Sequence, residues 1–487
     1  MEQESDFKNR VIRSFFWKFL ERAGSQVMQL AVQIVLARLL MPEDFGVLAI
    51  MIVFVNIANA IAESGLTTAL VQNKAVNLED YSTVFWMSLL LAVVIYIIIF
   101  LNADLLGKFY KLPEIGAYLK VLSIVVLVRV YPSVQQAEAQ RKLQYEKIFK
   151  STITGVVISG IVGIFLAFNG YGIWALVFQQ ITFSVGIGFS FFLQNKWYPK
   201  FYFNLKRAKE LYSFAWKLLA SSVMNTIYDS LSDLVIGKQF NAVNLGMVSQ
   251  GKKYPSALGL MLDGSIQPVM LSTVSKIQHD KLRVKNLVRR GLKTSTFVIF
   301  PAMALFAVIA KPIVLVLLGE KWLPSVPYLQ MYCFIMALLP IHSTNLQAIN
   351  GMGRSDIFLK LEVIKKIYGI IALYIGAFVF KSIDAIVISY MITGVISTFV
   401  NAHPSKKVIN YNYLEQIRDT MPSFSLAIIC ALITLPLGKI AFSPIFVIVI
   451  QVLVYAISYL GIAYIVKLEE LVYLITSAKK IIMKKLG

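Results

Sequence analysis

The stretch Val84–Leu101 reads VFWMSLLLAVVIYIIIFL and contains no charged residue. An α-helix rises about 1.5 Å per residue, so about 20 apolar residues cross a hydrocarbon core of about 30 Å. Because no water is available there, a segment that crosses the core must pair its own backbone groups, which favours helix. Blocks of similar length recur at Ile153–Phe168, Phe297–Leu318 and Ile445–Val466. The sequence therefore predicts an all-α integral membrane protein.

The overall composition supports this prediction. The chain has 487 residues, of which 57% are hydrophobic and 15% charged, and its mean hydropathy is +0.70. Soluble domains carry about 25% charged residues. The two cysteines, Cys333 and Cys430, lie far apart inside apolar blocks, which favours inert thiols over a disulfide or a metal site. No Gly-rich phosphate loop follows a strand pattern, so we expect neither an ATPase motor nor a cofactor.

We predict about 14 transmembrane helices. The first, seventh and eighth are polar for helices that face lipid. The predicted spans are residues 12–37, 45–71, 81–102, 115–137, 150–168, 172–193, 210–237, 243–274, 293–318, 326–348, 361–380, 384–401, 422–441 and 445–466. The segment Met1–Arg10 is charged and mixed, which is unlike a cleavable signal.

The basic residues of the loops give these spans a direction. About 30 Lys and Arg fall on one side of the predicted membrane and about 8 on the other. Cytoplasmic loops collect positive charge, so both termini are predicted to be cytoplasmic. The formal charge of +21 could also indicate a nucleic-acid partner. However, the basic stretch Lys276–Lys293 lies between two spans, which favours the anionic lipid surface over RNA.

An internal repeat relates the two halves of the sequence at an offset of 199–200 residues. Chance similarity among apolar segments is the alternative, and the constant offset argues against it. A repeat of six helices predicts two pseudo-symmetric lobes in the same orientation around a central cavity, over residues 1–200 and 201–403, with two further helices and a tail in 404–487. The matches pair Ser14–Leu20 with Ser213–Leu219, Phe45-Gly46 with Leu245-Gly246, and Ser64-Gly65 with Asp263-Gly264; weaker ones pair Tyr118-Leu119 with Tyr328-Leu329 and Gln136-Ala137 with Gln347-Ala348.

Several ionisable residues fall at bilayer depth, where a charge normally faces a cavity or a partner. The basic ones are Arg22, Arg129, Lys217, Lys252 and Lys253. Their excess predicts a cationic cavity for an anionic substrate such as phosphate or pyrophosphate. The acidic ones, candidates for a coupling-ion site, are Glu63, Asp229, Asp233 and Asp263.

A structural role is the alternative for these residues. Ion pairs such as Arg22 with Glu63 could only lock helices together. Amides on the same helices could bind sugar hydroxyls or simply join helices. These amides are Gln26, Gln29, Gln33, Asn56, Asn59, Asn225, Asn345 and Gln347.

The opening segment resembles a known family. The carrying residues are Trp17-Lys18, Gln33–Gly46 (QIVLARLLMPEDFG), Glu63–Leu66 (ESGL) and Ala69–Gln72 (ALVQ), and the resemblance is sharpest over about residues 14–73. They are similar to the polysaccharide transporter family, the Wzx-type flippases of the multidrug/oligosaccharidyl-lipid/polysaccharide exporter superfamily. The branch that serves colanic and teichuronic acid export is the most similar.

The resemblance implies a bacterial inner-membrane transporter without enzymatic activity. Such a protein moves an undecaprenyl-pyrophosphate-linked oligosaccharide between leaflets by alternating access, with a proton or sodium ion as the implied coupling ion. The resemblance also implies a polysaccharide polymerase as a partner.

Four other functions remain open at this point. A multidrug antiporter would share the fold, although Arg22, Lys252 and Lys253 disfavour cationic drugs. A lipid II flippase would also favour a cationic cavity. A membrane-bound polymerase or ligase would need larger external loops and a catalytic constellation, which His279, His342 and His403 do not form in the sequence. A non-transporting scaffold would leave the deep charges without a purpose.

Overall fold

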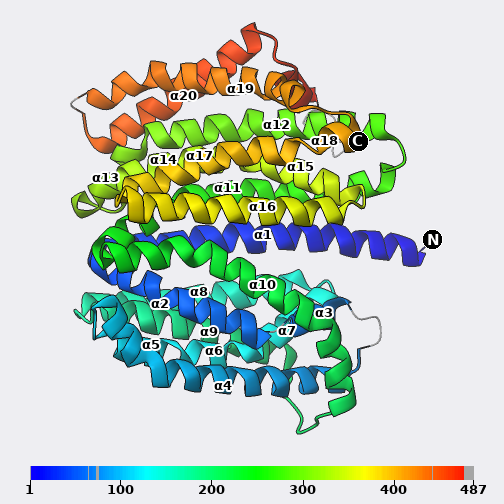
Figure 1. The fold of residues 1–487 in the computed structure, drawn as a ribbon, viewed down its shortest axis with the longest axis vertical. Helices are drawn as coiled ribbons and strands as arrows, with labels where there is room; N and C mark the ends of the chain where they lie inside the picture. Colours follow the sequence, from blue (N-terminus) through cyan, green and yellow to red (C-terminus); the bar gives the residue numbers. More distant parts are fainter. Residues whose placement is uncertain (1, 64, 73–75, 441, 477–487) are drawn as a thin grey trace. The chain divides into compact units, whose positions relative to one another are not determined.

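The computed structural model of the chain describes residues 2–63, 65–72, 76–440 and 442–476 (Figure 1). Within these ranges the regular secondary structure is helical and no strand occurs, as predicted. The chain forms two compact units, Met1–Ser249 and Gln250–Gly487.

The first unit is built around long helices. Helix α8 packs against both α1 and α9, and α2 lies against α9, α10 and α4. In Figure 1 these long helices run side by side. The elements are α1 (Glu2–Leu39), α2 (Pro42–Glu63), α3 (Leu66–Gln72), α4 (Leu78–Tyr110), α5 (Ile115–Leu122), α6 (Ile124–Val128), α7 (Val130–Arg141), α8 (Tyr145–Phe168), α9 (Ile173–Asn195), α10 (Leu205–Gln239) and the start of α11 (Ala242–Ile277).

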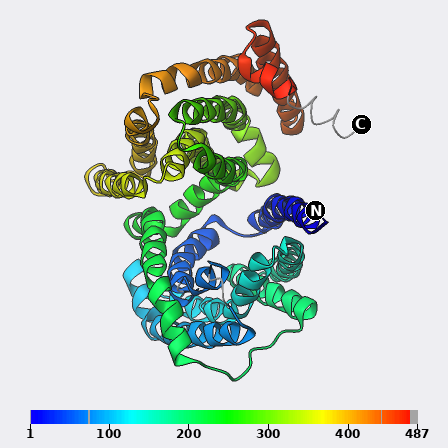
Figure 2. The same ribbon diagram turned by 90° about the vertical axis from the view of Figure 1, so that its right-hand side faces the viewer.

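The second unit continues from α11. Helix α12 packs against α14, α15 and α19, while α16 lies against α17 and α19 against α20. Figure 2 shows many of the helices nearly end-on. The elements are α12 (Lys281–Val308), α13 (Ala310–Leu317), η1 (Glu320–Ser325), α14 (Val326–Ala337), α15 (Leu339–Gly351), α16 (Ser355–Tyr374), η2 (Ile375–Val379), α17 (Ile383–Ala402), α18 (Ser405–Ile409), α19 (Tyr413–Thr434), η3 (Leu435–Lys439) and α20 (Pro444–Ile465).

Among the described residues, 11 helical segments are long and apolar enough to cross a membrane. They coincide with 11 of the predicted spans. The other three predicted spans fall on α1, α10 and α16. These helices have sufficient length, but each carries several charged residues, as Lys18, Glu21 and Arg22 illustrate in α1.

Several predicted spans are interrupted rather than continuous. The predicted span 45–71 is two helices because Gly65, between α2 and α3, has a φ of +65°. Proline explains three other interruptions, because it removes a helical hydrogen bond and its ring clashes with the carbonyl four residues earlier. Pro132 follows the end of α6, Pro312 the end of α12, and Pro340 the end of α14.

Two glycines allow an unusually close helix crossing inside the first unit. Gly46 lies near the start of α2 and Gly246 near the start of α11. A Cβ added to Gly46 would overlap the carbonyl oxygen of Ala242, and one added to Gly246 would overlap that of Pro42. The contact is therefore reciprocal, since each glycine faces the residue four positions before the other.

This crossing gives a test of the packing. We expect Gly46→Ala to lower the melting temperature of the detergent-purified protein, because overpacking costs about 1–3 kcal/mol. Gly461→Ala in α20 is the control, since a Cβ there meets no atom within 4 Å. That control should be neutral or slightly stabilising. Equal melting temperatures for Gly46→Ala and the wild type would contradict the observed crossing.

Candidate functional site

Glu63 and Arg129 form an ion pair in the first unit. Glu63 is the last residue of α2, where the positive φ of Gly65 turns the chain into α3. Arg129 lies at the interruption between α6 and α7, one turn before Pro132. The Arg129 Nε donates to Glu63 Oε1 at 2.8 Å. The two side chains remain 49% and 31% exposed, so the pair is accessible rather than sealed in the core.

The pair lies at the edge of a polar cavity of about 360 Å³. From Arg129 along α7 the polar lining residues recur at spacings of four, three and four residues, which places them on one helix face. The other wall is formed by α3, one turn beyond Glu63. The lining residues are Glu63, Thr67, Thr68, Val71, Gln72, Arg129, Ser133, Gln136, Ala137 and Gln140.

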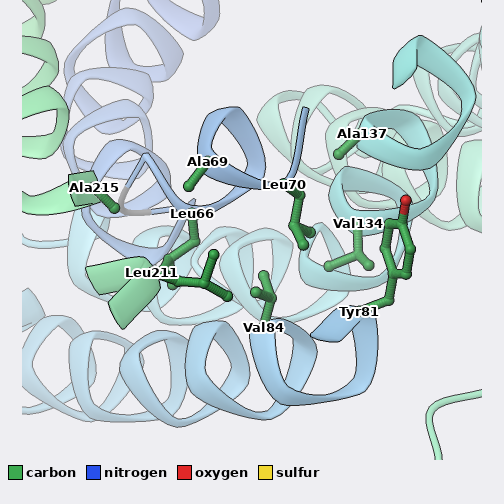
Figure 3. Packing of buried hydrophobic residues seen from close by; sticks show 9 residues of the cluster. All are labelled: Leu66, Ala69, Leu70, Tyr81, Val84, Val134, Ala137, Leu211 and Ala215. Carbon is green, nitrogen blue, oxygen red and sulfur yellow. The ribbon is translucent and has the colours of Figure 1, made fainter. Parts of the chain in front are cut away.

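The opposite faces of α3 and α7 belong to a buried apolar cluster. Leu66 and Leu70 of α3 point toward Val84 of α4 and Leu211 of α10 (Figure 3). The Arg141 guanidinium also donates from Nη1 to the backbone oxygen of Leu70 at 2.9 Å. This packing holds the two polar walls in place. The cluster consists of Leu66, Ala69, Leu70, Tyr81, Val84, Val134, Ala137, Leu211 and Ala215.

Asp263 is the centre of a second polar group, in the second unit. Its side chain lies in α11 and is only 1% exposed. Ser343 Oγ of α15 and Gln267 Nε2 of α11 both donate to the Asp263 carboxylate. Gln347 Nε2 then donates to Gln267 Oε1 at 3.3 Å. Asp263 thus receives neutral donors from α11 and α15, whereas Glu63 receives a guanidinium.

Two of the predicted polar residues join helices. Gln33 of α1 donates to Gln179 of α9 at 3.2 Å, and both side chains are buried. Asn345 of α15 exchanges hydrogen bonds with Gln416 of α19 at 2.8 and 3.1 Å. Gln33 and Asn345 therefore join helices, which is the alternative to sugar binding that the sequence left open. Cys333 and Cys430 are free, buried thiols.

The structure places the remaining predicted residues on three helices. Arg22 is exposed on α1, and Lys217 and Asp229 are exposed on α10. The partly buried ones are Asp233 of α10 and Lys252 and Lys253 of α11. Of the predicted set, Glu63 and Arg129 share one cavity, and Arg129 occupies the position on Glu63 that we suggested for Arg22.

Sequence reasoning missed the neutral lining of the cavity. Ser133, Gln136 and Gln140 follow Arg129 at helical spacing, and that periodicity was a usable signal. Gln267 follows Asp263 on α11 at a spacing of four residues, which was a similar signal. Ser343 carried no such signal, because it lies on a different helix, α15.

The fold and these polar groups define a class of protein. It is a polytopic helical membrane protein that keeps charged and amide side chains within its apolar units, as membrane transporters do.

The chain belongs to the polysaccharide biosynthesis protein family, whose model matches residues 35–327. It is 24% identical over 382 residues to the succinoglycan biosynthesis transport protein ExoT of Rhizobium meliloti (strain 1021), covering 78% of this chain and 76% of that one. It is 24% identical over 408 residues to the lipopolysaccharide biosynthesis protein WzxC of Escherichia coli (strain K12), covering 83% and 82%. For the teichuronic acid biosynthesis protein TuaB of Bacillus subtilis (strain 168), the identity is 23% over 393 residues, covering 79% and 78%. The predicted family is confirmed.

Solved structures share the fold. The lipid II flippase MurJ in an inward closed conformation superposes with a TM-score of 0.75 at 16% identity, covering 93% of this chain and 98% of that one. An inward-facing multidrug resistance MATE family transporter of the MOP superfamily gives a TM-score of 0.61 at 14% identity, covering 80% and 98%. At these identities the likeness concerns the fold alone.

The exposure of the Glu63–Arg129 pair predicts a small effect on stability. Arg129→Gln should lower the free energy of unfolding by about 1 kcal/mol or less, as for other accessible ion pairs. Asp263→Ala should cost about 1–3 kcal/mol, because it leaves buried donors without their acceptor. Thermal unfolding of both variants in detergent measures the difference. If Arg129→Gln lowered the stability more than Asp263→Ala, the Glu63–Arg129 pair would have mainly a structural role.

Proposed function

We propose that the chain moves an undecaprenyl-pyrophosphate-linked oligosaccharide from the inner to the outer leaflet of the bacterial inner membrane by alternating access. Family membership supports the substrate class, and the fold shared with membrane transporters supports the activity. The observation that carries the proposal is the polar cavity at Glu63 and Arg129 within a bundle of apolar helices. Ionisable residues of a membrane-spanning bundle normally face a pathway or a partner.

The proposed architecture completes the count of 14 spans with α1, α10 and α16. Residues 1–200 and 201–403 form two six-helix lobes around a central cavity, and residues 404–487 add two helices and a cytoplasmic tail. The reciprocal contact of Gly46 and Gly246 supports the repeat, because equivalent positions of the two copies meet there. Both termini are proposed to be cytoplasmic, as the distribution of basic residues favours.

Basic side chains hold the anionic part of the substrate in this proposal. Arg offers a fork of donors and Lys a mobile point charge, and both suit pyrophosphate. The residues proposed to bind either the pyrophosphate or the sugars of the substrate are Arg22, Arg129, Lys217, Lys252 and Lys253. The lipid tail stays in the bilayer while the headgroup passes through the cavity, and a polysaccharide polymerase is the proposed partner after release.

Acidic residues are the proposed coupling site for a proton or sodium ion. The candidates are Glu63, Asp229, Asp233 and Asp263. Asp263 has the strongest support, because it is buried and accepts hydrogen bonds from Ser343 and Gln267 where α11 meets α15.

Two related functions are the rivals. A lipid II flippase and a multidrug transporter have this fold, but fold alone does not assign a substrate. The family match and the basic residues favour the lipid-linked oligosaccharide over a cationic drug.

The first functional prediction concerns transport itself. The purified protein in liposomes should move a fluorescent polyprenyl-pyrophosphate sugar between leaflets faster than liposomes without protein do. Reduction of the label by an impermeant reagent measures the rate. Absence of movement, together with drug-driven ion exchange, would assign the chain to multidrug transport.

The second prediction concerns the adjacent lysines of α11. Lys252→Gln with Lys253→Gln should reduce polysaccharide export in cells to below about a tenth, because two charge-assisted contacts to pyrophosphate are lost. Lys406→Gln with Lys407→Gln is the matched control, since it neutralises an adjacent exposed pair in α18. Protein levels in the membrane should match the wild type in both variants. Full export by the α11 variant would remove these lysines from the site.

A further inference from the structure

The cavity beside Glu63 and Arg129 is lined mainly by neutral side chains that both donate and accept hydrogen bonds. Thr67 and Thr68 offer hydroxyls, and Gln72, Gln136 and Gln140 offer amides. Ser133 offers its hydroxyl oxygen as an acceptor, because its O–H donates to the backbone oxygen of Val130. A hydroxyl or a carboxamide pairs with a group that both donates and accepts. A phosphate oxygen only accepts, so it would leave half of this lining unused. Sugar hydroxyls match the lining fully.

The charge of the lining also favours a sugar over a phosphate group. Among the described residues around the cavity, Glu63 and Arg129 carry the only charges, and they pair at 2.8 Å. The lining is therefore close to neutral overall, and the Glu63 carboxylate would repel a pyrophosphate. A paired guanidinium and carboxylate instead present donors and acceptors side by side, as neighbouring hydroxyls on a sugar ring require.

The size and rigidity of the cavity limit what it holds. Its volume of about 360 Å³ is near the lower end of the range for small-molecule sites, about 300–1,000 Å³. Val71 and Ala137 add small apolar surfaces that suit the C–H face of a ring. Leu66, Leu70 and Val134 anchor the opposite faces of the same two helices in the buried cluster. A preformed site of this kind loses little entropy when it binds.

From these observations we infer that the Glu63–Arg129 cavity is a subsite for one or two neutral sugar residues of the lipid-linked glycan. Arg129 then contacts the sugar, and the pyrophosphate is held elsewhere. The inference rests on the proposed function and deepens it. Helix α2 runs from the predicted outer side at Pro42 to Glu63, so the subsite lies toward the side from which the proposed substrate enters.

The test compares two lipid probes on one pair of variants. Both probes are fluorescent undecaprenyl pyrophosphates, one carrying a neutral glucosyl-galactose disaccharide and the other carrying no sugar. The test variant is Thr67→Val with Gln136→Leu. The control variant is Thr182→Val with Ser458→Ala, whose hydroxyls donate to carbonyls of their own helices. Binding in detergent, by fluorescence anisotropy, and transfer between leaflets in liposomes are both measured.

We expect the test variant to bind and transfer the disaccharide probe roughly tenfold less well, since about two net hydrogen bonds are lost. Its binding of the sugar-free probe should stay within about twofold of the wild type, and the control variant should match the wild type for both probes. Equal losses for the two probes, or no loss for either, would overturn the subsite. So would a wild type that binds neither probe.

Failure of the proposed function has a different signature. If the wild type binds the disaccharide probe but transfers neither lipid, the flippase assignment falls. The subsite stands in that case as long as the test variant binds the disaccharide probe selectively more weakly.

Discussion

An ionisable side chain in a helical membrane protein normally faces a partner or a cavity. Two carboxylates are accommodated in different ways. Glu63 receives the Arg129 guanidinium across the end of α2, whereas Asp263 receives a hydroxyl and an amide in α11 and α15. The helix interruptions position the two residues of the Glu63–Arg129 pair. Gly65 ends the α2 segment at Glu63, and the interruption before Pro132 sets Arg129 at its level.

The two carboxylates occupy nearly equivalent places in the predicted repeat; Ser133 lines the cavity beside Glu63, and Ser343 donates to Asp263. The local fold is thus similar while the chemistry differs. Glu63 is paired with arginine and partly exposed, next to a cavity with room for a ligand. Asp263 is buried, and Ser343 and Gln267 donate to its carboxylate.

The sequence was sufficient to predict the helical fold, because runs such as Val84–Leu101 satisfy the length rule for crossing a bilayer. It was also sufficient to identify Glu63 and Arg129 as unusual. It did not reveal that they pair, because they lie 66 residues apart in the sequence and the choice of partner depends on tertiary packing. The interruption at Gly65 was hidden for another reason. The apolar pattern continues across it, so residues 45–71 resemble one span although a positive φ divides them.

The reciprocal contact of Gly46 and Gly246 has a consequence for how this sequence can vary. In most helix crossings, a larger residue on one side is offset by a smaller one opposite. Here each glycine faces a backbone carbonyl, of Ala242 or Pro42, and a carbonyl has no side chain to shorten. No second substitution can therefore compensate for the first. The two glycines, 200 positions apart, must therefore both stay glycine, whereas the rest of the two halves of the repeat is free to diverge.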